Sequence, residues 1–167
     1  MANNASTAVS DLDDFDRRIL DIVQRDNQRT HADIGEAVGL SASAVRRRLK
    51  LLRDTGFIEK DVALLRLGEM GVRLVVLVSF QNESIEAFDA FDEQIRTTPE
   101  ILQGYHISGS VDYCLIVQGP SLEWYEDWGK RAFMSNSAIR RYDSHVVWSC
   151  KKFETAIPLR DGLLPIR

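Results

Sequence analysis

The chain has 167 residues, is 44% hydrophobic and 28% charged, and carries a formal net charge of −4. This length holds one large domain or two small ones, and the composition is that of an ordinary soluble protein. No apolar run approaches the roughly 20 residues of a membrane-spanning helix, and the first residues lack the basic start and apolar stretch of a secretion signal. We therefore expect a cytoplasmic protein. Its two cysteines, Cys114 and Cys150, have no metal-ligand spacing and are predicted to be buried free thiols.

The first predicted helix follows a small, polar N-terminus, residues 1–11, which we expect to be disordered. Its apolar residues recur at steps of three and four, the spacing of one buried helix face. That face consists of Leu12, Phe15, Ile19, Ile22 and Val23. The side chains predicted to face solvent are Asp13, Asp14, Asp16 and Arg17.

A second, short helix is predicted after Thr30, which is a favourable N-cap. Asp33 stands where a capping box needs an acid. Gly35 inside this helix costs about 1 kcal/mol relative to alanine, so we expect a close helix crossing that leaves no room for a larger side chain. Gly39 and Leu40 then form a turn.

The third predicted helix begins after its cap, Ser41, and ends at Thr55 and Gly56. At 100° per residue one face is apolar and predicted to be buried, and it is formed by Val45, Leu49 and Leu52. The segment from Ser41 to Arg53 has no acidic residue and five cationic ones, namely Arg46, Arg47, Arg48, Lys50 and Arg53. A concentrated positive stripe in an otherwise acidic protein is placed to meet a polyanion.

Two helices joined by a glycine turn predict a helix-turn-helix, whose second helix enters the major groove of DNA. Arginine can form two hydrogen bonds to guanine, whereas Lys50 and the remaining arginines would neutralise phosphates. Arg48 lies at the border of the buried face, so it either supports the fold or reaches a phosphate. The predicted DNA-binding residues are Thr30, Ser41, Ser43, Arg46, Arg47, Arg48 and Lys50. This domain spans residues 12–60; a short strand over residues 57–65 would make it winged, and residues 61–71 hold the strand end and a linker.

The second half of the chain predicts strand, helix, strand, strand, helix, strand, which is the βαββαβ order of a ferredoxin-like domain over residues 72–167. The predicted elements cover residues 72–81, 83–98, 101–107, 111–118, 122–132 and 139–150. In such a fold both helices cover one face of the sheet. The other face would carry Val75, Leu77, Cys114 and Ile116, and these apolar residues predict burial against another copy of the chain. The fold class is therefore α+β, and we expect at least a dimer.

The sequence resembles the Lrp/AsnC family of transcriptional regulators over nearly its whole length. The opening residues Leu12, Asp13, Asp16, Ile19 and Leu20, with Arg29, fit the family pattern. The family's helix-turn-helix signature is matched by Val38, Gly39, Leu40, Ser41, Ser43, Val45, Arg48, Leu49, Leu52, Gly56, Phe57 and Ile58. Its characteristic glycine, aspartate and aromatic residue before the third strand are matched by Gly109, Asp112 and Tyr113.

This resemblance implies a C-terminal ligand-sensing domain that responds to an amino acid or a related metabolite, and homodimers that assemble into tetramers or octamers. Effector contact would fall on Gly109, Asp112 and Tyr113, although Asp112 fits a structural role in its turn equally well. The chain departs from the family at Gly35, where alanine is more usual, and in the linker, which lacks a common proline.

Two alternative functions remain open at this level. An enzyme or a metal sensor could use His106, His145, Asp112 and Cys114, but their spacing is not that of a zinc site, and we expect neither catalysis nor a cofactor. The other alternative is a ligand-independent architectural DNA-binding protein, which would show little sequence preference.

Overall fold

The computed structural model describes residues 12–65, 71–81 and 84–159. The predicted N-terminal disorder and most of the predicted linker lie outside these residues. The chain divides into two compact units. The first combines residues 12–64 with 152–159, and the second spans residues 65–151. Residues 152–159, which the sequence predicts to belong to the second domain, group instead with the first unit.

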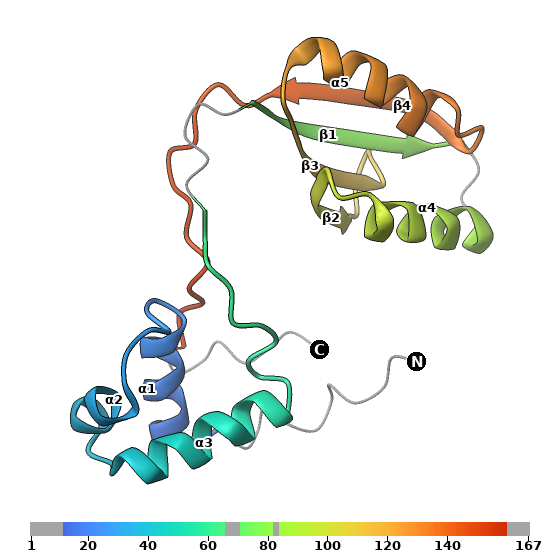
Figure 1. The fold of residues 1–167 in the computed structure, drawn as a ribbon. Coiled ribbons are helices and arrows are strands. Elements are labelled where there is room, and N and C mark those ends of the chain that lie inside the picture. The colour runs from blue at the N-terminus through green and yellow to red at the C-terminus, as the bar shows by residue number, and fades with distance from the viewer. Residues whose placement is uncertain (1–11, 66–70, 82–83, 160–167) are drawn as a thin grey trace. The chain divides into compact units, whose positions relative to one another are not determined.

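The first unit contains three helices around a small apolar core (Figure 1). Its core residues come from all three helices, and the best buried are Ile19, Ile34, Val38 and Val45. The helix bounds are α1 (Asp14–Val23), α2 (His31–Val38) and α3 (Ala42–Asp54). The predicted strand over residues 57–65 is wrong, because these residues have no regular strand pairing. The structure therefore shows no wing within residues 12–65.

The lack of space around Gly35 explains why a glycine stands at this position of α2. A Cβ atom at this position would lie 2.4 Å from the carbonyl oxygen of Leu40, in the turn that follows the helix. The expected lack of space is confirmed, but the close neighbour is the backbone of the turn and not a crossing helix. Gly39 ends α2 with a φ of +80°, in the left-handed region that glycine tolerates.

The second unit is a four-stranded antiparallel sheet in the order β2-β3-β1-β4. Its elements are β1 (Val72–Phe80), α4 (Ile85–Thr97), β2 (Ile101–His106), β3 (Tyr113–Gly119), α5 (Leu122–Gly129), the π-helix η2 (Lys130–Met134) and β4 (Ile139–Val146). This is the predicted βαββαβ order. The second helix of this unit is predicted to include Ala132, but α5 ends at Gly129 and η2 follows it.

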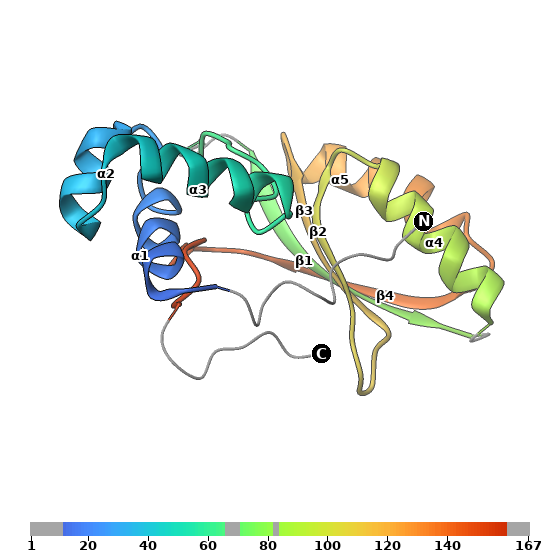
Figure 2. The ribbon, with the colours of Figure 1, turned by 90° about the horizontal axis from the view of Figure 1, so that it is seen from below.

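Helices α4 and α5 lie on the same side of the sheet (Figure 2). Alternate residues of β1 and β3, such as Val76 and Leu115, are fully buried on that side and join the core. The intervening residues are only half-buried, and the register pairs Val75 with Ile116 and Leu77 with Cys114. The predicted apolar patch is therefore contiguous on the second face. Cys114 is half-buried, but Cys150 is exposed, which contradicts its predicted burial.

Candidate nucleic-acid interface

Helix α3 is fixed by local sequence at its start and by packing along one face. The side chain of Ser41 accepts a hydrogen bond from the Ala44 N–H at 3.2 Å, as an N-cap residue does. Val45, Leu49 and Leu52 are buried, with exposed fractions of 3% or less. This packing directs the opposite face of α3 outward, as the sequence predicts.

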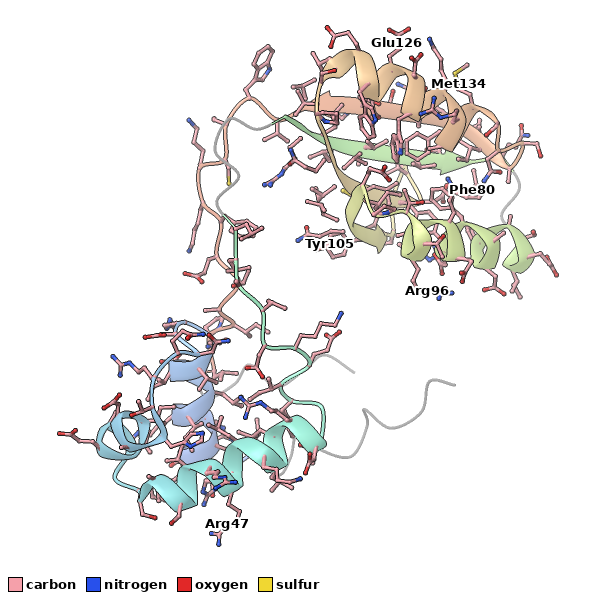
Figure 3. All side chains as sticks on the ribbon, in the orientation of Figure 1. Arg47, Phe80, Arg96, Tyr105, Glu126 and Met134 are labelled. Atoms are coloured by element: carbon pink, nitrogen blue, oxygen red, sulfur yellow. The ribbon has the colours of Figure 1, made fainter. Side chains whose placement is uncertain are left out.

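Arg46 and Arg47 are exposed on this outward face. Arg47 points away from α1 and α2 (Figure 3). Within the described part of the chain, no hydrogen bond or ion pair engages either guanidinium group. Ser43 is also exposed, and its hydroxyl lies 3.1 Å from that of Ser41. The two arginines can therefore be offered to a ligand without breaking a contact among the described residues, and they lie near the hydroxyl groups of Ser41 and Ser43.

Arg48 is committed to the fold. Its Nη1 lies 2.8 Å from a carboxylate oxygen of Asp13 and 2.8 Å from one of Asp16, and its guanidinium carbon lies 5.4 Å from the centroid of the Phe15 ring. The hydrogen bonds that Arg48 donates, first to Asp16 and then to Asp13, raise the pKa of its guanidinium group. Of the two roles open for this residue, the geometry supports the structural one.

The same contacts correct the sequence analysis of the first helix. Asp16 was expected in solvent, yet it is 9% exposed and faces Arg48. Asp13 caps α1 by accepting a hydrogen bond from the Asp16 N–H at 2.8 Å, and this bond is the main reason that the pKa of Asp13 is lowered. A carboxylate that is shielded from water needs a partner of opposite charge. Arg48, which lies 32 positions further along the chain, is this partner for Asp16.

The remaining cations of α3 have acidic partners at the surface. Lys50 pairs with Asp54 one turn along the helix. Arg53 pairs with Asp61 at 2.9 Å, which raises the pKa of the guanidinium and lowers that of the carboxyl group. Thr30 forms the predicted capping box with Asp33 at the start of α2. Exposed ion pairs contribute little to stability, so Lys50 can exchange its partner at small cost.

The second candidate site is the loop between β2 and β3, where each predicted effector residue has a structural task. Gly109 has a φ of +133°, which disfavours other residues. Asp112 accepts a hydrogen bond from the Phe80 N–H at 2.7 Å, where a bulge interrupts the pairing of β1 with β4. Tyr113 is 1% exposed, and its hydroxyl group donates to Asp92 at 2.8 Å. Burial, together with the Asp92 carboxylate, raises the pKa of Tyr113.

The residues considered for metal binding do not come together. His106 stacks on Tyr113, on the side of the sheet that the helices cover, with ring centroids 4.8 Å apart. Cys114 lies on the other face, and β1 separates its strand from that of His145. No group of three or more histidine, cysteine, aspartate or glutamate side chains suited to a metal ion occurs among the described residues.

Known proteins match both units. Residues 12–53 match the AsnC-type helix-turn-helix domain, and residues 73–157 match the Lrp/AsnC ligand binding domain. A glutamate uptake regulatory protein of Zymomonas mobilis is 34% identical over 152 residues, which cover 89% of this chain and 91% of that protein.

Two solved structures have the same fold. An AsnC family transcriptional regulator from Agrobacterium tumefaciens has a TM-score of 0.82 at 33% identity, covering 89% of this chain and 97% of that one. A transcriptional regulator from Neisseria meningitidis in complex with L-methionine also has a TM-score of 0.82, at 28% identity and with the same coverage.

The fold and the outward basic helix thus define a DNA-binding transcriptional regulator that carries a ligand-binding domain. The chain belongs to the Lrp/AsnC family, whose members are transcriptional regulators. None of its described helices is long and apolar enough to cross a membrane.

Proposed function

We propose that the outward face of α3 reads double-stranded DNA. Arg46 and Arg47 are the groups that contact base edges or phosphates, because both are exposed and uncommitted on the second helix of the helix-turn-helix motif. Ser41, Ser43, Lys50 and Thr30 are assigned contacts to the DNA backbone. Arg48 is assigned to the fold, where it holds Asp13 and Asp16. A cytoplasmic location is part of this proposal, because the DNA target would lie there.

The DNA-bound form is proposed to be at least a homodimer, joined through the half-buried face of the sheet around Val75 and Leu77. A dimer would present its two α3 helices to successive major grooves, about 34 Å apart, on an inverted repeat. Tetramers or octamers are the higher assemblies that the family resemblance implies.

The test uses a duplex enriched from a random pool with the full chain. Arg47→Ala is expected to weaken binding to this duplex and, if Arg47 meets a phosphate, to reduce the slope of log K against log salt by about one unit. Fluorescence anisotropy at several salt concentrations measures both quantities.

Arg131→Ala is the matched control, because Arg131 is an exposed arginine in the second unit and its loss changes the net charge equally. Equal binding by the wild type and Arg47→Ala would contradict the proposed face. Enrichment that selects no sequence would instead favour the architectural alternative.

The effector is proposed to be an amino acid. The Neisseria meningitidis structure, which contains L-methionine, supports this class of ligand. The proposed contact lies at the loop of residues 108–112 and involves its backbone groups and the accessible part of Asp112. The buried Tyr113, which follows this loop, would hold the loop in position. An effector that binds one assembly better than another would shift the population toward it.

A thermal-shift screen of the common amino acids tests this part of the proposal. A ligand present at about 100 times its dissociation constant should stabilise the folded protein by about 2.7 kcal/mol. An unchanged melting temperature with every amino acid would remove the support for amino-acid sensing and leave the DNA-binding proposal standing.

A further inference from the structure

The segment after the last strand returns to the DNA-binding unit and bonds to the end of α1. The Gln24 side chain donates from Nε2 to the carbonyl oxygen of Ile157 at 2.8 Å, and its Oε1 accepts from the Ile157 N–H at 2.8 Å. One side-chain amide thus satisfies both backbone groups of a residue 133 positions away. This is the pairing that a neighbouring strand would supply.

Two further contacts shape this segment. The Glu154 carboxylate accepts hydrogen bonds from the N–H groups of Ala156 and Thr155, which lower the pKa of Glu154 and order the backbone just before Ile157. Leu159 packs against the apolar core of the three helices. We call residues 157–159 the tail latch.

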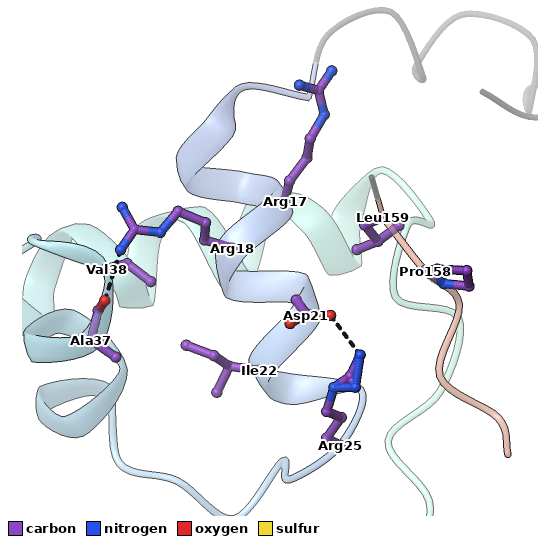
Figure 4. Close-up of a pocket in the computed structure, with 9 residues that line it drawn as sticks. All are labelled: Arg17, Arg18, Asp21, Ile22, Arg25, Ala37, Val38, Pro158 and Leu159. Carbon is purple, nitrogen blue, oxygen red and sulfur yellow. Dashed lines mark hydrogen bonds and ion pairs between the residues drawn. The ribbon is translucent and has the colours of Figure 1, made fainter. Parts of the chain in front are cut away.

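The contact between the tail latch and the helices is narrow. A cavity of about 500 Å³ remains between Pro158 and Leu159, α1 and the end of α2 (Figure 4). The Ile157 side chain itself is 64% exposed. A contact with two hydrogen bonds and one apolar side chain belongs to the less stable part of a protein, where opening is frequent and reversible.

The chain topology makes the segment that ends in the tail latch one of two connections between the units. The second unit is inserted between two segments of the first, so the chain passes between the units twice. Both passages leave the sheet at the same place, because β1 begins beside the end of β4 and the Val147 N–H donates to the Arg73 carbonyl oxygen at 2.8 Å. While the latch is docked, the segment after β4 is therefore held to the three helices as well as to the sheet.

We propose that the tail latch is a reversible second attachment that completes the DNA-binding unit and restricts its freedom, so that two copies of α3 are presented to paired half-sites. The docking itself rests only on the contacts above. Its effect on DNA rests on the proposed function.

The docking is tested by amide hydrogen exchange on the full chain. Gln24→Ala removes both hydrogen bonds to Ile157, so the exchange rate of the Ile157 amide should rise about five- to thirtyfold. Gln28→Ala is the matched control, since Gln28 is an exposed glutamine whose side chain bonds only to neighbouring Asn27 in the described chain. An Ile157 amide that exchanges equally in both variants would overturn the docking.

The effect on DNA is tested with a pair of variants at one position. Ile157→Pro removes the N–H donor, whereas Ile157→Ala keeps both backbone groups and loses only an exposed side chain. Ile157→Pro should bind a duplex with two half-sites about three- to tenfold more weakly than Ile157→Ala, with equal affinity for a single half-site.

The experiments distinguish a failure of the restricting role from a failure of the proposed function. Equal affinities of the two Ile157 variants for the paired half-sites, with faster exchange in Gln24→Ala, would overturn the restricting role. If the wild type binds no DNA, the proposed function fails, and the exchange experiment still decides whether the latch docks.

Discussion

At the scale of single residues, five consecutive positions of α3 separate into different tasks. Arg46 and Arg47 are exposed and form no ion pair with any described residue, Arg48 is held by two carboxylates, Leu49 is buried, and Lys50 pairs with Asp54. Charge alone does not distinguish these cations. The acidic partners of Arg48 on α1 distinguish it from Arg46 and Arg47. An arginine that neutralises a carboxylate shielded from water cannot leave it without a cost in free energy.

Arg48→Met tests this division. It keeps the apolar stem over Phe15 but leaves Asp16 shielded and unpaired, so we expect the first unit to lose about 1–3 kcal/mol of stability. Thermal unfolding measures this loss, and the salt dependence of DNA binding should stay at the wild-type slope at a temperature where the variant is folded. A slope reduced by about one unit with unchanged stability would show that Arg48 meets a phosphate instead.

At the scale of elements, the turn between α2 and α3 sets the identity of Gly35. The carbonyl of Leu40 occupies the space that a side chain would take, and the left-handed Gly39 brings it there. The turn of this chain therefore lies closer to α2 than an alanine at this position would permit.

Gly35→Ala is therefore expected to destabilise the first unit by about 1–3 kcal/mol, although alanine gains about 1 kcal/mol in intrinsic helix propensity. Urea unfolding followed by amide exchange in α2 measures the effect. Gly129→Ala is the control, because a Cβ there would meet only ordinary contacts of 3.7 Å or more in α5. A stabilised Gly35→Ala protein would show that the turn yields at no cost.

At the scale of the whole molecule, the half-buried face of the sheet is the surface on which the proposed dimer depends. Val75, Leu77, Cys114 and Ile116 form one apolar patch across β1 and β3, because the strand register places them opposite one another. Helices already cover the other face of this sheet, so assembly would bury the patch without disturbing the core.

Leu77→Glu places a charge in the centre of this patch and should convert the proposed dimer into monomers at micromolar concentration. Sedimentation velocity reports the change. Met134→Glu is the matched control, since Met134 is 68% exposed on η2, in the helical layer. A Leu77→Glu protein that sediments as the wild type does would place the interface elsewhere.

Much of the fold and part of the site could be predicted from the sequence because the signals involved are local. The caps Thr30 and Ser41 act within three residues, and each begins a helix where predicted. The spacing of Val45, Leu49 and Leu52 determines which side of α3 faces outward. The βαββαβ order follows in the same way, from alternation in strands and three- and four-residue spacing in helices.

Only the tertiary structure decided the contacts between distant segments. The ion pair of Arg48 with Asp16 and the hydrogen bonds between Gln24 and Ile157 join groups far apart in the sequence, and the local pattern around one group gives no information about the other. An acidic residue beside an apolar helix stripe has the same sequence pattern whether water or an arginine faces it. The sequence alone therefore determined the elements and the basic face of α3, whereas the packed structure decided which cations remain free for DNA and which segments complete the DNA-binding unit.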